Sequence, residues 1–232
     1  MRVPRLKEAV AFCRRHDMVS LIDSTFASPV NLQPLSLGID LVFHSATKYL
    51  NGHSDLAAGC VMGSRKMIEE IRKTMNHFGG TLDPHAGFLL ARGIKTLALR
   101  VKAANANGLA LARFLSTHPK VREVNYPGLE DHPDHGHARE LLSGFSGMLS
   151  LRLKGGAPAA RRLIESVRLP YPAPSLGGVE SLITQPALTS HAGMSPEERE
   201  RVGVTEDLVR VSCGIEHAED LVEDFRQALD RV

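Results

Sequence analysis

The sequence lacks both common glycine-rich phosphate loops, since neither GxGxxG nor GxxxxGK followed by Ser or Thr occurs in its 232 residues. This excludes the usual loops for dinucleotides and nucleoside triphosphates. No apolar run approaches the roughly 20 residues that span a bilayer, and the opening segment MRVPRLKEAVAFCRRHD lacks the apolar stretch of a secretory signal. A net charge of +2 gives no electrostatic case for nucleic acid or an anionic membrane. We therefore expect a soluble cytoplasmic protein without nucleic-acid or membrane partners.

Cysteine is also scarce, with only Cys13, Cys60 and Cys213 spread along the chain. Their odd number and wide spacing match no zinc pattern. We expect reduced thiols that serve as small buried residues, as is usual in the cytoplasm.

Histidines gather only in the segment DHPDHGHARE, at His132, His135 and His137. Pro133 and Gly136 interrupt them and no cysteine lies near, so the segment predicts a solvated loop leading into a helix. We predict no metal site.

Short apolar runs indicate an α/β fold. MVSLID, GIDLVFHS and AAGCVMGS each predict a buried strand, in the near-continuous form typical of a parallel sheet covered on both faces. Strands are also expected in VREVNYPG, in EDLVRVSCG and in GMLSLRLKG, whose alternation predicts half-exposure. Helices are predicted over residues 4–16, 65–77, 85–93, 95–118, 137–143, 157–167 and 217–231. We predict a larger sheet domain over residues 1–114 and a smaller one over 115–232, joined by the long helix.

One lysine stands apart from the surface charges. In HSATKYLNGHSD, Lys48 follows a predicted strand, while Asp23 ends the strand before it. Open α/β sheets bind ligands at the carboxyl ends of their strands, so both side chains are expected to line one cleft. Ser45 and Thr47 add two hydroxyls. An amine, a carboxylate and hydroxyls suit the aldehyde, pyridinium nitrogen and phosphate of pyridoxal 5'-phosphate.

Other interpretations exist for the same residues. Taken singly, Lys48 is typical of a surface lysine, Asp23 of a loop carboxylate, and Ser45 with Thr47 of a turn. Ser45 and Lys48 also fit the S-x-x-K motif of serine acyl-transfer enzymes. That motif needs its serine at a helix start and two further motifs, of which SDN is absent and KTG is approached only by KGG.

The segment HSATKYLNGHSD resembles the cofactor-lysine segment of the Cys/Met-metabolism family of pyridoxal-phosphate enzymes. These are the relatives of cystathionine γ-synthase, cystathionine γ- and β-lyase and methionine γ-lyase. LIDSTFASP resembles the family's aspartate strand, FGGTLDPHAGFLLARGIKTLALRV its central helices, and YPGLEDHPDH the start of its small domain. SLGGVESLITQPALTSHAGMS and LVRVSCGIEHAEDLVEDF resemble its substrate-carboxylate region. The resemblance implies a fold-type-I architecture and a homo-oligomer, a dimer or homotetramer.

The resemblance also implies roles for individual residues. Lys48 holds the cofactor and shuttles protons, Asp23 pairs with the pyridinium nitrogen, and Ser45 and Thr47 bind the phosphate. Arg210 clamps the substrate carboxylate, a task suited to a planar guanidinium.

Two weaker assignments follow from the same likeness. Ser175, in PSLGG, assists at the carboxylate or the cofactor linkage. Thr189 supports the site without contacting the substrate.

The implied activity is carbon–sulfur cleavage of sulfur amino acids by γ-elimination on cystathionine, methionine or homocysteine. Capture by a thiol instead gives γ-replacement, as in cystathionine γ-synthase or O-acyl-homoserine sulfhydrylase. Family chains carry a longer N-terminal part with site tyrosines that Tyr49, Tyr126 and Tyr171 do not match. Without it we expect weak cofactor binding and an exposed sheet edge. A non-catalytic homologue and a Ser45 hydrolase are the remaining alternatives.

Overall fold

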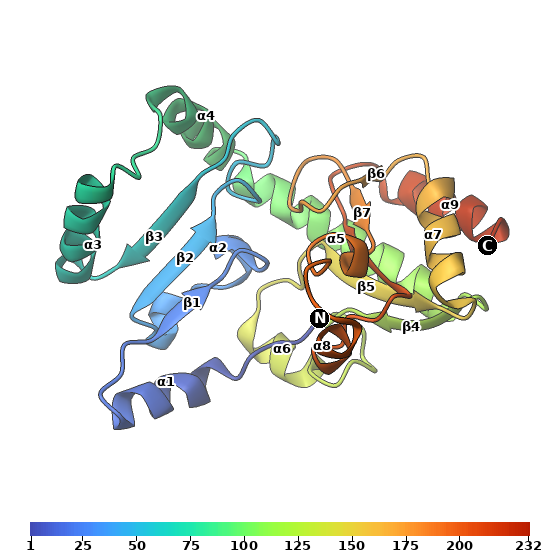
Figure 1. Ribbon diagram of the computed structural model, residues 1–232, viewed down its shortest axis with the longest axis horizontal. Coiled ribbons are helices and arrows are strands. Elements are labelled where there is room, and N and C mark those ends of the chain that lie inside the picture. Colours follow the sequence, from blue (N-terminus) through green and yellow to red (C-terminus); the bar gives the residue numbers. More distant parts are fainter.

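The computed structural model describes all of residues 1–232 and contains two separate sheets (Figure 1). The first has the order β1 (Leu21–Asp23), β2 (Leu41–Ser45), β3 (Gly59–Gly63). The second has the order β4 (Val121–Asn125), β5 (Met148–Leu153), β8 (Leu208–Ser212), β7 (Leu182–Thr184), β6 (Tyr171–Pro172). Strand β6 and β7 were not predicted, because YP and LIT are too short to show a period.

The first sheet is mixed rather than parallel. Strand β1 pairs with β2 in parallel, but β3 runs antiparallel to β2, so the expected all-parallel sheet is wrong. Helix α1 (Leu6–Arg15) covers one face, where Val10 packs with Val42. The other face is open, with Leu21 59% and Val61 40% exposed. A short apolar run does not distinguish these pairings or show whether both faces are covered.

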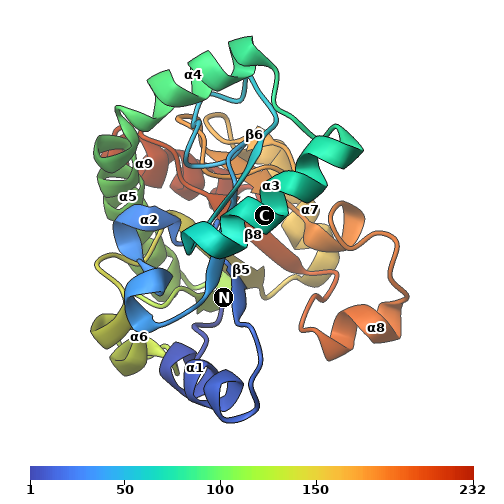
Figure 2. The same cartoon turned by 90° about the vertical axis from the view of Figure 1, so that its left-hand side faces the viewer.

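Two helices follow β3; in Figure 2, α3 (Arg65–Phe78) lies at the front and α4 (Pro84–Ile94) runs along the top. Helix α3 starts at Ser64, whose side chain accepts from the backbone of Met67, and ends where Gly79 takes a φ of +73°. Helix α4 is capped by Asp83. No residue of α3 is buried, and Ile71 and Met75 of its apolar stripe are 36% and 38% exposed.

Helix α5 (Leu97–Thr117) connects the two halves of the fold. Leu97 and Val101 pack in a cluster with Tyr49 of the first half, whereas Leu111 and Leu115 belong to the large core of the second. The expected boundary between residues 114 and 115 thus falls in the last turns of a helix that both halves share.

The second sheet carries the main core. Helices α5, α7 (Gly156–Ser166) and α9 (Ala218–Asp230) supply the apolar side chains that pack on the inner side chains of β5, β7 and β8. Five of the six residues of β5 are buried, so its predicted half-exposure is wrong. On its other face, Ser150 is flanked across the strands by Asn125 and Arg210, and Met148 packs in the cluster that contains Tyr49.

The remaining elements are short. They are α2 (Ser28–Asn31), η1 (Pro34–Leu37), α6 (His135–Leu141), η2 (Pro186–Leu188) and α8 (Pro196–Arg201). The predicted helices all form, with ends close to those expected. No helix has both the length and the apolarity to cross a membrane.

The histidine segment is less solvated than expected. His132 is 7% exposed, its ring Nε2 lies 2.9 Å from the carbonyl oxygen of Met1, and its Nδ1 accepts from the backbone of Asp134. These contacts tie the segment to the start of the chain. Cys213 is buried as predicted, but Cys13 and Cys60 are only half-buried.

Candidate functional site

Lys48 lies in a turn directly after β2, where the sequence places it. Its backbone N–H donates to the carbonyl of Ser45 at 3.1 Å, and its carbonyl accepts from Gly52 at 2.8 Å. The turn is therefore tied to the strand before it and closed on itself.

The Lys48 amine points toward the second half of the chain. Its Nζ donates to Ser175 Oγ at 2.8 Å. Burial lowers the pKa of Lys48 below its ordinary 10.5, and the positive charge of Arg210 lowers it further. The surface-lysine interpretation predicts an amine in solvent, whereas Lys48 is half-buried and its amine is bonded to Ser175.

Arg210 sits in β8, at the centre of the second sheet. Its neighbours across the strands are Ser150 of β5 and Thr184 of β7. One terminal nitrogen donates to the carbonyls of Pro174 at 2.8 Å and Ser175 at 2.9 Å. The Nε atom is buried without any partner, and burial lowers the pKa of the guanidinium. Ser175 therefore contacts both residues. Its backbone carbonyl accepts from Arg210, and its side-chain hydroxyl accepts from Lys48.

Asp23 and Ser45 lie on one face of the first sheet. Asp23 pairs in register with Phe43, so Ser45, two residues on, points to the same side. Thr25 links them, because its hydroxyl donates to Asp23 Oδ1 at 2.5 Å and accepts from the backbone of Ser45 at 2.8 Å. Asp23 is exposed on the open face.

The two predicted phosphate hydroxyls differ in their surroundings. Thr47 Oγ1 accepts from Ala58 N at 3.0 Å and donates to Ala58 O at 3.3 Å. The hydroxyl of Ser45 makes no hydrogen bond within the chain and is half-exposed. Ser45 ends a strand rather than starting a helix, so the serine acyl-transfer interpretation is wrong.

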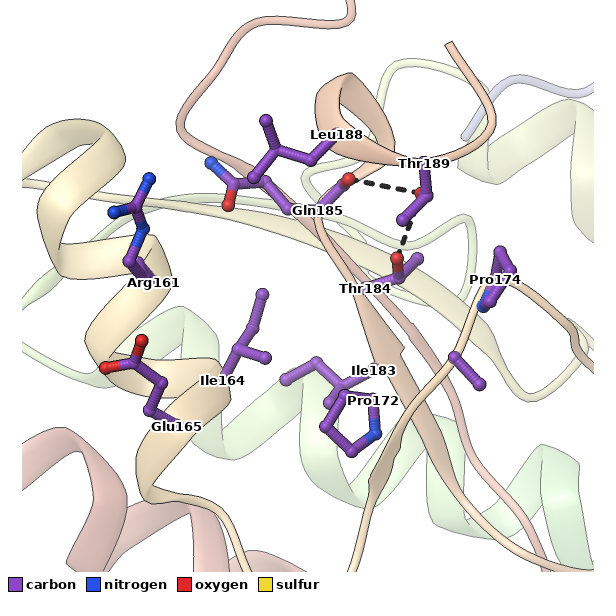
Figure 3. Close-up of a pocket in the computed structure, with 11 residues that line it drawn as sticks. Arg161, Ile164, Glu165, Pro172, Pro174, Ile183, Thr184, Gln185, Leu188 and Thr189 are labelled. Carbon is purple, nitrogen blue, oxygen red and sulfur yellow. Dashed lines mark hydrogen bonds between the residues drawn. The ribbon is translucent and has the colours of Figure 1, made fainter. Parts of the chain in front are cut away.

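Thr189 lies away from the lysine. Figure 3 shows its hydroxyl against Thr184 and Gln185, at 3.0 Å from Thr184 Oγ1 and donating to the Gln185 carbonyl at 3.2 Å. It lines a cavity of about 430 Å³ between α7 and β7 that also touches Pro174. Its hydroxyl lies beside that of Thr184, the strand neighbour of Arg210.

Sequence reasoning missed two residues that hold the site together. Thr25, two positions after Asp23, forms a turn in which the carboxylate accepts from its backbone at 2.9 Å, a pattern that Asp-Ser-Thr could have signalled. Tyr49 lies 3.1 Å from Ser146 Oγ with its hydroxyl, and burial raises its pKa to about 12. No local pattern indicates that contact, since the two residues come from distant segments.

The residues fit the cofactor that the sequence suggested. The Lys48 amine, the free hydroxyl of Ser45 and the exposed carboxylate of Asp23 match its aldehyde, phosphate and pyridinium nitrogen. The unpartnered Nε of Arg210 adds a buried donor for a carboxylate.

The chain matches the family described as Cys/Met metabolism PLP-dependent enzyme over residues 1–230, and it belongs to that family, as its motifs predicted. It is 44% identical over 220 residues to cystathionine gamma-synthase 1, chloroplastic, of Nicotiana tabacum, covering 95% of this chain and 41% of that protein. It is 44% identical over 232 residues to the cystathionine beta-lyase of Lactococcus lactis subsp. cremoris MG1363, covering 100% of this chain and 61% of that protein.

A solved structure agrees with these matches. Cystathionine gamma synthase from Xanthomonas oryzae pv. oryzae in complex with cystathionine has a TM-score of 0.97 and 40% identity, covering 99% of this chain and 60% of that chain. The expected fold-type-I α/β architecture is confirmed. The chain spans 41% to 61% of the length of these three relatives.

Proposed function

We propose that this chain forms part of a pyridoxal-phosphate-dependent carbon–sulfur lyase, which acts on cystathionine, methionine or homocysteine by γ-elimination. The observation that carries the proposal is the held, half-buried Lys48 amine, which meets Ser175 beside Arg210. A small-molecule amino acid is the substrate class.

The residues divide the binding task. Lys48 would hold the cofactor through its amine, Asp23 would pair with its ring nitrogen, and Ser45 with Thr47 would bind its phosphate. When bound, pyridoxal phosphate supplies the electron sink that stabilises a carbanion at the substrate α-carbon. Arg210 binds the substrate carboxylate with the Nε that has no partner in the chain.

Once the substrate amine has replaced it on the cofactor, the free Lys48 amine would move protons. Because burial and Arg210 lower its pKa, its amine is more often neutral than that of an exposed lysine and can accept the α-proton. Ser175 accepts a hydrogen bond from the same amine and directs it. Thr189 steadies β7 beside Arg210 through Thr184.

γ-Replacement is a second candidate, favoured by the tobacco and Xanthomonas relatives, which are named as synthases. The chain residues would act alike in both reactions, until a thiol instead of water reacts with the bound fragment that remains after the γ-substituent has left. A non-catalytic homologue is the third candidate, consistent with the partial coverage of the relatives.

Cofactor attachment is the first test. The chain is incubated with pyridoxal phosphate, reduced with borohydride and mapped by peptide mass. The expected adduct lies on Lys48, is lost in Lys48→Ala and is retained in Lys102→Ala, which changes an exposed lysine of α5. An unmodified Lys48 in the wild-type chain refutes the proposal and supports the non-catalytic candidate.

The products formed distinguish elimination from replacement. Methionine, homocysteine and cystathionine are each supplied as substrate, with and without an added thiol as acceptor. Release of ammonia and a 2-oxo acid supports elimination. A new thioether without ammonia supports replacement and overturns γ-elimination.

We also propose a cytoplasmic homo-oligomer, a dimer or homotetramer. Large apolar side chains are exposed on each of α3, α4 and α5, with Phe78 86%, Phe88 64% and Leu99 72% exposed. A self-associating protein covers such a surface. Light scattering that gives a monomer mass across the concentration range would contradict this.

A further inference from the structure

Arg100 is a buried cation with no part in the proposed chemistry. It lies in α5 and is 6% exposed. Its guanidinium donates to the carbonyls of Tyr49 at 2.8 Å, Leu50 at 3.3 Å and Gly93 at 2.7 Å, and to Thr96 Oγ1 at 3.0 Å.

All four of these acceptors are uncharged. Burial alone accounts for the lowered pKa of Arg100, and no carboxylate offsets it. A buried charge without a counter-ion is costly, so the hydrogen bonds it makes must do something that an apolar side chain does not.

Two glycines allow the close packing around the guanidinium. A Cβ at Gly52, whose φ is +76°, would overlap Arg100, and one at Gly93 would overlap the carbonyl of Asn51. The turn of residues 49–52 is therefore pressed against the junction of α4 and α5. Of the residues Arg100 contacts there, Tyr49 and Leu50 are the two that directly follow Lys48 in the chain.

We propose that Arg100 is a positioning residue for Lys48. Arg100 fixes the turn of residues 49–52 by donating hydrogen bonds to the carbonyls of Tyr49 and Leu50. The Tyr49 hydroxyl, 3.1 Å from Ser146, fixes the other side of the same turn. Held between these contacts, the flexible Lys48 chain reaches Ser175 rather than solvent.

The proposal rests on the proposed role of Lys48, but it concerns the free amine and needs no cofactor for its test. If the turn loosens, the amine leaves Ser175 and gains solvent, so its pKa rises toward 10.5. Arg210 of β8 is the charged group that acts on this amine.

Two variants perturb Arg100 to different degrees. Arg100→Lys keeps the positive charge but loses the planar set of donors. Thr96→Val removes only the hydroxyl that accepts from Arg100 Nε. The matched controls on α5 are Arg113→Lys, an exposed arginine, and Thr117→Val, an exposed threonine bonded one turn back to Phe114.

The readout is the pH dependence of Lys48 acetylation by acetic anhydride, followed by peptide mass, with Tm measured in parallel. Arg100→Lys is expected to move the midpoint upward, toward the ordinary pKa of 10.5, and Thr96→Val by less. Both controls should match the wild type. A lower Tm with an unmoved Lys48 midpoint in Arg100→Lys overturns the proposal, because Arg100 then supports only the fold.

If Arg100→Lys does not fold, Thr96→Val decides alone, and an unmoved midpoint there also overturns it. If no cofactor adduct forms but the Lys48 acetylation midpoint moves as expected, the proposed function is wrong and the positioning role of Arg100 still holds. The two outcomes are therefore distinguishable.

Discussion

Lys48 and Ser175 lie 127 residues apart in the sequence, yet the amine of one donates to the hydroxyl of the other at 2.8 Å. Lys48 follows the first sheet, whereas Ser175 lies in the loop between β6 and β7 of the second. The amine that the proposed chemistry needs is therefore held by contacts from both halves of the fold.

Replacing Ser175 should impair the amine without harming the fold. In Ser175→Ala, Lys48 loses the one hydrogen bond of its side chain, so we expect borohydride-trapped cofactor adduct to form about 5-fold more slowly. Adduct formation is followed by peptide mass. Ser116→Ala, an exposed position on α5, is the control. Equal rates in all three proteins would show that Ser175 does not hold the amine.

Arg210→Lys should weaken amino-acid binding. A lysine cannot reproduce the donors that hold the carbonyls of Pro174 and Ser175 while offering a further N–H to a ligand. Loss of one charge-assisted bond costs about 2 kcal/mol, or roughly 30-fold in affinity. Titration with a non-reacting amino acid checks this, with Arg162→Lys on the surface of α7 as control. Undiminished binding by Arg210→Lys would remove Arg210 from the carboxylate site.

Substitution of Ser45 and of Thr47, the two residues proposed to bind the phosphate, should have different effects on cofactor affinity and on Tm. Ser45→Ala removes a hydroxyl that makes no hydrogen bond within the chain. Cofactor affinity should therefore fall, while Tm should equal that of the wild type. Thr47→Val breaks both bonds to Ala58 and should destabilise the protein by about 1 kcal/mol. Cofactor titration and thermal unfolding of the two variants are compared. A Tm that falls equally in both would mean that Ser45 has a structural partner.

Helices were predictable because their apolar spacing and caps are local. Ser64 and Asp83, for example, cap α3 and α4 within a turn of each helix start. Strand direction was not predictable, since a short apolar run such as AAGCVMGS suits either pairing. Burial of β5 was not predictable either, because Asn125 and Arg210, which flank Ser150, come from strands distant in the sequence.

The site shows the same division. Lys48, Asp23 and Ser45 were identified because each stands at the end of a predicted strand, where α/β folds place ligands. Arg210 and Ser175 came only from the resemblance, since an arginine in an alternating strand is ordinary. Arg100 escaped both routes, because nothing local marks an arginine in a long helix as buried.

His44 should make the fold sensitive to acid. It is 3% exposed in β2, and burial lowers its pKa below the ordinary 6.5, although the charge of Asp23 opposes the shift. Between the lowered pKa and 6.5 the unfolded chain binds a proton that the folded chain does not, so the free energy of unfolding falls as pH drops through 6.5. His44→Gln cannot take up that proton. Its free energy of unfolding, measured with urea, should fall less between pH about 7 and about 5 than that of the wild type.

Part of the fall remains in His44→Gln, because His118 and His132 also have lowered pKa values. The exposed His77→Gln should behave as the wild type. If His44→Gln loses as much stability as His77→Gln, the acid sensitivity arises elsewhere.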